Sequence, residues 1–166
     1  MAPVRLDQVD WAKVTTAIRP PMGRFVAEVA DTLRWTRFTR RSGTNVYTLH
    51  VPSELVENVR ESESVKNVGR RVTARIEYPD TEKGRRMGES LTKRVAMALG
   101  IDPSDLIPTT VTDEEDPYNG GLIEGHEGRR FQLTIDEVDD SYNNQAGEHI
   151  ERTAIRFYFD PVRDEA

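Results

Sequence analysis

The chain has 166 residues, contains no cysteine and carries a formal net charge of −6. Its length suits one domain, 1–166, with a real core, and the lack of cysteine excludes disulfides and thiolate metal sites. No apolar run approaches the ~18 residues needed to cross a membrane, and Asp7 and Asp10 interrupt any signal-peptide pattern. We therefore expect a soluble cytoplasmic protein with no membrane partner.

Charge is unevenly divided along the chain. Residues 1–100 hold 18 Lys and Arg against 12 Asp and Glu, a net charge of +6, whereas residues 101–166 hold 5 against 17, a net charge of −12. This asymmetry predicts a basic working surface and an acidic region that faces elsewhere. The acidic total does not exclude nucleic-acid binding, but a local basic patch must then supply the affinity.

The first expected elements are a short helix and a strand. Apolar residues recur with an imperfect helical period over 7–19, and Pro20-Pro21 ends that helix. Alternating residues over 24–30 predict the first strand.

The next stretch, residues 33–43, is basic and aromatic. Four arginines and two large aromatic residues fall between positions 34 and 41, and no acid occurs between Asp31 and Glu54. Arginine neutralises phosphate and exposed aromatic rings stack on unpaired bases, so this composition suits single-stranded nucleic acid. The structural alternative is that an aromatic residue lies in the core and the arginines are solvated.

The middle of the chain predicts two more strands. A strand over 45–51 forms a long hairpin with the first, with its turn at 40–44. Residues 53–68 are polar and are interpreted as a short helix or a loop. The third strand, over 70–78, alternates cleanly.

The clearest helix pattern covers about residues 83–99. Met87 and Leu91 begin its apolar stripe, which continues through Val95. Gly100 stands where a C-terminal cap belongs.

The acidic half completes the pattern. Residues 101–128 are interpreted as an acidic loop, whose length is typical of functional or disordered segments. A fourth strand over 129–138, a hairpin loop over 139–147 and a fifth strand over about 150–159 follow, and 161–166 form an acidic tail. We also hypothesise that the acidic loop mimics phosphate and covers the basic surface until DNA displaces it.

The order strand, strand, strand, helix, strand, strand is that of the OB-fold, a five-stranded Greek-key barrel. We therefore predict a mainly β domain with a helix: an OB-like barrel over 23–160, with the helix between strands three and four and the short N-terminal helix in front. Such barrels bind oligonucleotides across strands two and three. Here those strands carry the basic hairpin, Arg71 and Arg75.

Several short segments also carry a resemblance to a known family. They are residues 25–32, 39–43, 96–101, 122–125, 129–135, 155–157 and 160–161. Together they resemble a family of small bacteriophage early proteins described as single-stranded-DNA-binding-like, found beside replication and recombination genes. The resemblance implies an OB-fold, binding of single-stranded DNA and, for a phage-encoded chain, a role in the host bacterial cytoplasm.

We predict a non-catalytic protein that binds single-stranded DNA with low sequence specificity and uses no metal or cofactor. Arginines are expected to contact phosphates and aromatic rings to stack on bases. These predicted nucleic-acid-binding residues are Arg34, Trp35, Arg37, Phe38, Arg40, Arg41, Arg71 and Arg75. An extended backbone places Trp35 and Arg37 on one face, which makes Phe38 the aromatic residue expected in the core.

Two other functions stay open. The first is a protein-interaction module of a replication, recombination or virion complex, in which Trp35 and Arg37 anchor the interface. The second is a metal-dependent nuclease, since residues 79–83 superficially resemble a nuclease motif, although one tight turn cannot bring its acids into the required geometry. Partner proteins and homo-oligomerisation are left open by the sequence.

Overall fold

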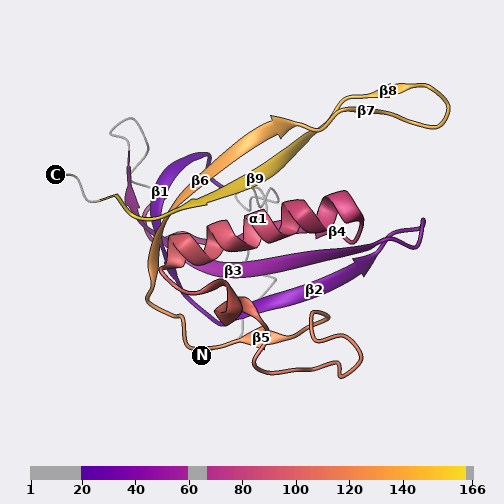
Figure 1. The fold of residues 1–166 in the computed structure, drawn as a ribbon. Coiled ribbons are helices and arrows are strands. Elements are labelled where there is room, and N and C mark those ends of the chain that lie inside the picture. The colour runs from indigo at the N-terminus through magenta and orange to yellow at the C-terminus, as the bar shows by residue number, and fades with distance from the viewer. Residues whose placement is uncertain (1–19, 60–66, 164–166) are drawn as a thin grey trace, which may run out of the picture.

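A computed structural model describes residues 20–59 and 67–163 (Figure 1). The helix predicted over 7–19 and the end of the tail, 164–166, lie outside the described residues. The described elements are β1 (Gly23–Val29), β2 (Leu33–Thr39), β3 (Asn45–Asn58), β4 (Arg71–Pro79), α1 (Glu82–Leu99), the short 3-10 helix η4 (Pro103–Leu106), β5 (Leu122–Ile123), β6 (Arg130–Asp139), β7 (Tyr142–Asn143), β8 (His149–Ile150) and β9 (Thr153–Asp160). Among them, no helix is both long enough and apolar enough to span a bilayer.

One antiparallel sheet organises the domain. Its strands follow the order β5-β2-β3-β1-β6-β9, and β4 pairs with the other edge of β3. β3 therefore pairs with three strands. Along one edge its first half pairs with β2 and its second half with β1, and along the other edge most of its length pairs with β4. No ladder joins β4 to β9 within the described ranges, so the sheet is not a closed barrel. The predicted mainly β class with one long helix is confirmed.

The strand boundaries differ from the prediction at two places. Residues Leu33–Thr39 form a strand of their own, β2, before the turn at 40–44, where the Gly43 amide donates to the Arg40 carbonyl at 2.9 Å. Residues 53–58, expected as a short helix or loop, continue β3 instead. Pro52 does not end the strand, because it lies where the partner on one edge of β3 changes from β2 to β1.

Helix α1 ends at the predicted Gly100, and it begins after Thr81, a cap that was not predicted. The Thr81 side chain caps its first turn by accepting from the Gly84 amide at 3.0 Å. Gly100 ends it in the left-handed conformation, with φ 71°, which glycine adopts without steric penalty. Local capping chemistry thus fixes both ends of the helix.

The predicted apolar stripe of α1 is confirmed at Leu91 and Val95, which pack on or in the core, but it is wrong at its first residue. Met87, expected in that stripe, is 47% exposed, whereas Gly84 and Gly88 are buried. The Tyr78 ring packs so closely on Gly88 that a Cβ there would lie 2.5 Å from a ring carbon. The helix therefore turns its glycines toward β4, and this rotation brings Met87 to the surface.

The segment 101–128, predicted as a loop, is tied to the sheet. Asp102 caps η4, and Leu106 and Ile123 are buried in the core. The Trp35 amide donates to the Gly121 carbonyl at 2.9 Å, next to the short β2–β5 ladder. This segment extends the sheet beyond β2.

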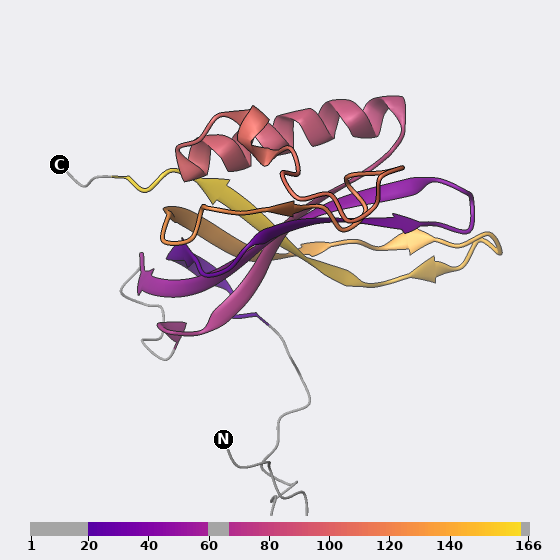
Figure 2. The same cartoon turned by 90° about the horizontal axis from the view of Figure 1, so that it is seen from below.

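The domain has two sides, which Figure 2 shows in projection. Helices α1 and η4 cover one side of the sheet, and the core lies beneath them, with Phe131 and Phe159 stacked at 5.3 Å between ring centroids. No described helix covers the opposite side of β2, β3 and β4 (Figure 2).

Candidate nucleic-acid interface

Strand β2 divides the predicted site residues between the two sides of the sheet. Successive side chains of a strand point to opposite faces, and Leu33 and Trp35 are buried toward α1. Arg37 follows them in phase, whereas Arg34 and Phe38 project to the side away from α1. The structure thus separates residues that were predicted to act together.

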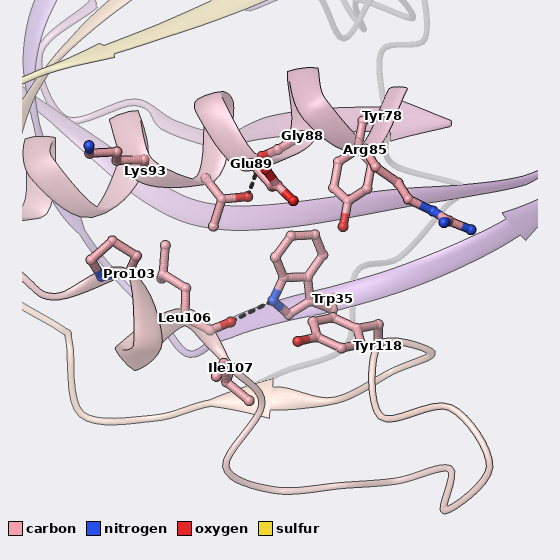
Figure 3. Close-up of a pocket in the computed structure, with 11 residues that line it drawn as sticks. Trp35, Tyr78, Arg85, Gly88, Glu89, Lys93, Pro103, Leu106, Ile107 and Tyr118 are labelled. Atoms are coloured by element: carbon pink, nitrogen blue, oxygen red, sulfur yellow. Dashed lines mark hydrogen bonds between the residues drawn. The ribbon is translucent and has the colours of Figure 1, made fainter. Parts of the chain in front are cut away.

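Trp35 is a core residue with 2% exposure. Its Nε1 donates to the Leu106 carbonyl at 2.8 Å, and its ring meets Tyr78 and Tyr118 edge-on, at 6.2 and 5.3 Å between centroids (Figure 3). A ring held in this way has no free face for a nucleobase. Its role is to join β2 to η4 and to the segment after it.

Phe38 is the exposed aromatic residue, with 67% of its surface accessible. The expectation that Phe38 lies in the core is wrong. The physical reason is phase: Leu33 and Trp35 set the buried alternation of β2, and Phe38 is one position out of step with them. A free ring of this kind is what base stacking requires.

Arg37 is engaged inside the protein. Its Nη1 donates to Asp116 Oδ2 at 2.7 Å, and the Tyr47 hydroxyl donates to the same oxygen at 3.4 Å. Burial and the Asp116 charge raise the pKa of Tyr47, so the phenol stays protonated at neutral pH. The Arg37–Asp116 ion pair therefore binds the acidic segment, residues 101–128, to the helix side of the sheet. The Arg37 side chain faces away from Phe38.

The side of the sheet away from α1 carries a surface that we call the open face. It consists of Arg34, Thr36, Phe38, His50, Thr73 and Arg75. His50 stands directly opposite Arg34 in one ladder and Arg75 in the other. Three adjacent strands thus present one row with an arginine at each end, about 10 Å apart at the usual strand spacing.

His50 forms the neutral centre of this row. Its Nε2 lies 2.8 Å from Thr36 Oγ1. Partial burial, followed by the charges of Arg34 and Arg75, lowers the pKa of His50. The imidazole is therefore mostly neutral at pH 7 and offers a polar contact between two cations. The sequence analysis missed it, although the alternation of the second strand puts it on the face away from Leu49.

The arginines of this region have free charges. In the part of the chain that the structure describes, no carboxylate forms an ion pair with Arg34, Arg40, Arg41, Arg71 or Arg75. Arg40 and Arg41 are exposed in the turn between β2 and β3. Glu77, on β4, is the exposed acid beside this row. Five cations are thus available to a polyanion.

Two projecting segments flank the open face. The β2–β3 hairpin and the β7–β8 arm (residues 139–153) diverge in Figure 1, and in Figure 2 both extend toward the same end of the molecule. On the arm, the Arg152 guanidinium lies 4.7 Å from the centroid of the Tyr142 ring. Arg75 reaches toward the base of this arm, 5.5 Å from the centroid of Phe157. Sequence reasoning treated the arm only as a hairpin loop.

The described residues contain no group of three or more His, Cys, Asp or Glu arranged to hold a metal ion. Within the nuclease-like segment, Asp80 accepts from Arg85 at 2.6 Å and Glu82 begins α1. That segment is therefore a strand-to-helix turn.

Comparisons with known proteins add no assignment. No protein-family model matches the chain, and no curated protein matches it. The open face is therefore the feature from which a function can be inferred.

Proposed function

We propose that the protein binds single-stranded DNA non-covalently and with low sequence specificity. The ligand lies across the open face, where Arg34 and Arg75 contact phosphates and Phe38 stacks on a base. Arg40 and Arg41 extend the basic track at the turn, and Arg71 extends it along β4. Trp35 and Arg37, predicted from the sequence to bind DNA, support this surface from the opposite side.

The observation that carries the proposal is the exposed Phe38 ring on the same face as Arg34 and Arg75, neither of which forms an ion pair with a residue that the structure describes. An aromatic platform next to a groove of free cations is the combination that proteins use for unpaired strands. Duplex DNA keeps its bases stacked within the helix, so it gains nothing from Phe38. The expected preference is therefore for single strands.

The topology also supports the proposal. Taking β1 and β2 as one interrupted strand, the order β1/β2, β3, β4, α1, β6, β9 and the antiparallel pairings follow the OB plan. The flanking hairpins then correspond to the loops with which OB domains hold oligonucleotides. We accordingly propose an opened relative of the OB-fold, in which α1 packs on both β4 and β9 in place of a closing ladder.

The resemblance to phage early proteins gives the proposal a biological setting. A non-specific single-strand binder of this kind would act in replication or recombination, in the bacterial cytoplasm. Its ligand there is single-stranded DNA that other proteins expose.

Fluorescence anisotropy tests the proposal. A labelled oligo-dT of about 16 nucleotides, the upper range for one OB domain, is compared with a matched duplex at roughly 50 and 200 mM salt, a range over which phosphate contacts weaken. We expect micromolar or tighter binding of the single strand, with weaker binding at the higher salt. Absence of binding to oligo-dT would refute the proposal.

Paired variants locate the ligand. Arg75→Gln should lower the slope of log affinity against log salt by about 0.7, the value for one phosphate contact on a single strand. Arg86→Gln removes the same charge from the exposed side of α1 and should leave that slope unchanged. Equal effects of both variants would mean that the protein attracts DNA only through its overall charge.

A further inference from the structure

The helix side of the domain contains a pocket that the proposed DNA-binding function does not use (Figure 3). Its volume is about 450 Å³. Figure 3 shows Trp35, Tyr78 and Tyr118 at one end and Leu106 with Ile107 along the other wall. The pocket is therefore lined mainly by aromatic and aliphatic groups, and it lies across the sheet from the open face.

A second groove runs along the other flank of α1. Its volume is about 560 Å³, and its lining includes Leu91, Met97 and Phe159. Large apolar side chains are exposed at both sites: Ile107 is 54% exposed beside the first pocket and Met97 is 59% exposed beside the second groove. Exposed apolar groups gathered beside grooves are typical of surfaces that bind other proteins.

Free positive charge separates the two grooves. Lys93 lines both of them and Arg94 lines the second, while one carboxylate lies in each lining, Glu89 in the first pocket and Asp160 in the second groove. Neither side chain forms an ion pair with any residue that the structure describes, whereas Arg85 is held by Asp80 at 2.6 Å and Arg86 by Glu82 at 3.3 Å. Unpaired cations between two apolar grooves complement a segment that alternates acidic and apolar side chains.

We propose that this surface docks an acidic peptide segment of a partner protein, with an aromatic or aliphatic side chain in the first pocket and carboxylates on Lys93 and Arg94. The apolar lining favours a peptide over a polynucleotide, because a phosphate backbone needs a continuous track of cations, whereas a peptide can supply the apolar side chain that the first pocket accepts. The two surfaces are on opposite sides of the sheet, so the protein could hold a partner and a DNA strand together.

A titration of the isotope-labelled full chain followed by NMR tests this inference. The probe is the peptide acetyl-Asp-Asp-Asp-Phe-Asp-Asp-Asp-amide. We expect saturable shifts of amide signals in α1 and at Leu106 and Ile107. Replacing the phenylalanine of the probe by alanine, or its aspartates by lysines, should abolish these shifts. Absence of saturable shifts, shifts confined to the open face, or equal binding of either control peptide would overturn the proposal.

Charge-reversed variants provide the matched control. Lys93→Glu should weaken binding of the probe by about fivefold, the upper range for an exposed ion pair. Lys83→Glu makes the same change of charge at the N-terminal end of α1, away from both grooves. This variant should bind the probe with an affinity within about twofold of that of the unchanged protein. If the two variants lose the same affinity, the surface acts only through net charge and the proposal fails.

The same variants keep this inference separate from DNA binding. Lys93→Glu should bind oligo-dT as the unchanged protein does, and a matching loss would assign α1 to the DNA path instead. Failure of the unchanged protein to bind oligo-dT would refute the proposed function but would not alter the peptide result.

Discussion

Phe38 and Trp35 are three positions apart on one strand, and this odd spacing sends them to opposite faces. Phe38→Ala should reduce the affinity for oligo-dT by about 1–3 kcal/mol, the usual contribution of one stacked base. The unfolding free energy should hardly change, because the ring is 67% exposed. Anisotropy and urea denaturation of the same preparation measure the two quantities.

Trp35→Phe is the counterpart of that experiment. The substitution leaves the Leu106 carbonyl without its donor, so the unfolding free energy should fall by about 1–3 kcal/mol. The folded protein should bind oligo-dT with unchanged affinity. A loss of affinity for oligo-dT without a loss of stability would instead support the prediction from the sequence that Trp35 stacks on a base.

His50 makes stability depend on pH. Because its pKa is lowered in the folded state, unfolded chains bind the proton first as the pH falls below about 6.5. The contribution of the neutral imidazole is therefore present above that pH and is lost as the pH falls through the folded-state pKa. The difference in unfolding free energy between the unchanged protein and His50→Gln should shrink from pH 7.5 to about pH 5.5. A constant difference would contradict this account.

Only part of the site could be predicted from the sequence at this scale. The clean alternation of the third strand sufficed to put Arg71 and Arg75 on an exposed face. The ion pair between Arg37 and Asp116 could not be predicted, because the two residues are 79 positions apart along the chain. The phases of Trp35 and Phe38 were readable in principle, since Leu33 shares the face of Trp35.

At the scale of elements, the contact between Gly88 and Tyr78 fixes how α1 sits on β4. Gly88→Ala would place a methyl group against the ring, so the unfolding free energy should fall by about 1–3 kcal/mol despite the better helix propensity of alanine. Ser90→Ala, on the exposed side of the same helix, is the control and should have little effect. Chemical denaturation compares the variants, and a stabilised Gly88→Ala would show that the helix is free to move away.

The elements that could be predicted are those with local signals. The turn at 40–44 and the stop at Gly100 each depend on neighbouring residues. The continuation of β3 beyond Pro52 does not depend on neighbouring residues. It is possible because Pro52 lies between the residues of β3 that pair with β2 and those that pair with β1. The rotation of α1 likewise depends on Tyr78, which belongs to another element.

For the whole molecule, the acidic segment and the open face are on different sides. Asp116 holds Arg37 on the helix side, which does not favour the hypothesis that this segment covers the basic surface. Asp116→Asn should therefore leave the affinity for oligo-dT within about twofold while lowering stability by about 1 kcal/mol, since the pair is partly exposed. An affinity that rises clearly in this variant, measured by anisotropy, would support covering of the basic surface.

Strand β3 has a further consequence for how the protein opens. Three strands pair with its two edges, so the opening of any one ladder exposes only part of its amide protons. The arm at 139–153 forms no ladder with β3, so it can open without breaking the hydrogen bonds of that strand. In deuterated water the interior amides of β3 should therefore exchange last, and the centre of the open face should keep its shape while its margins adapt to a strand.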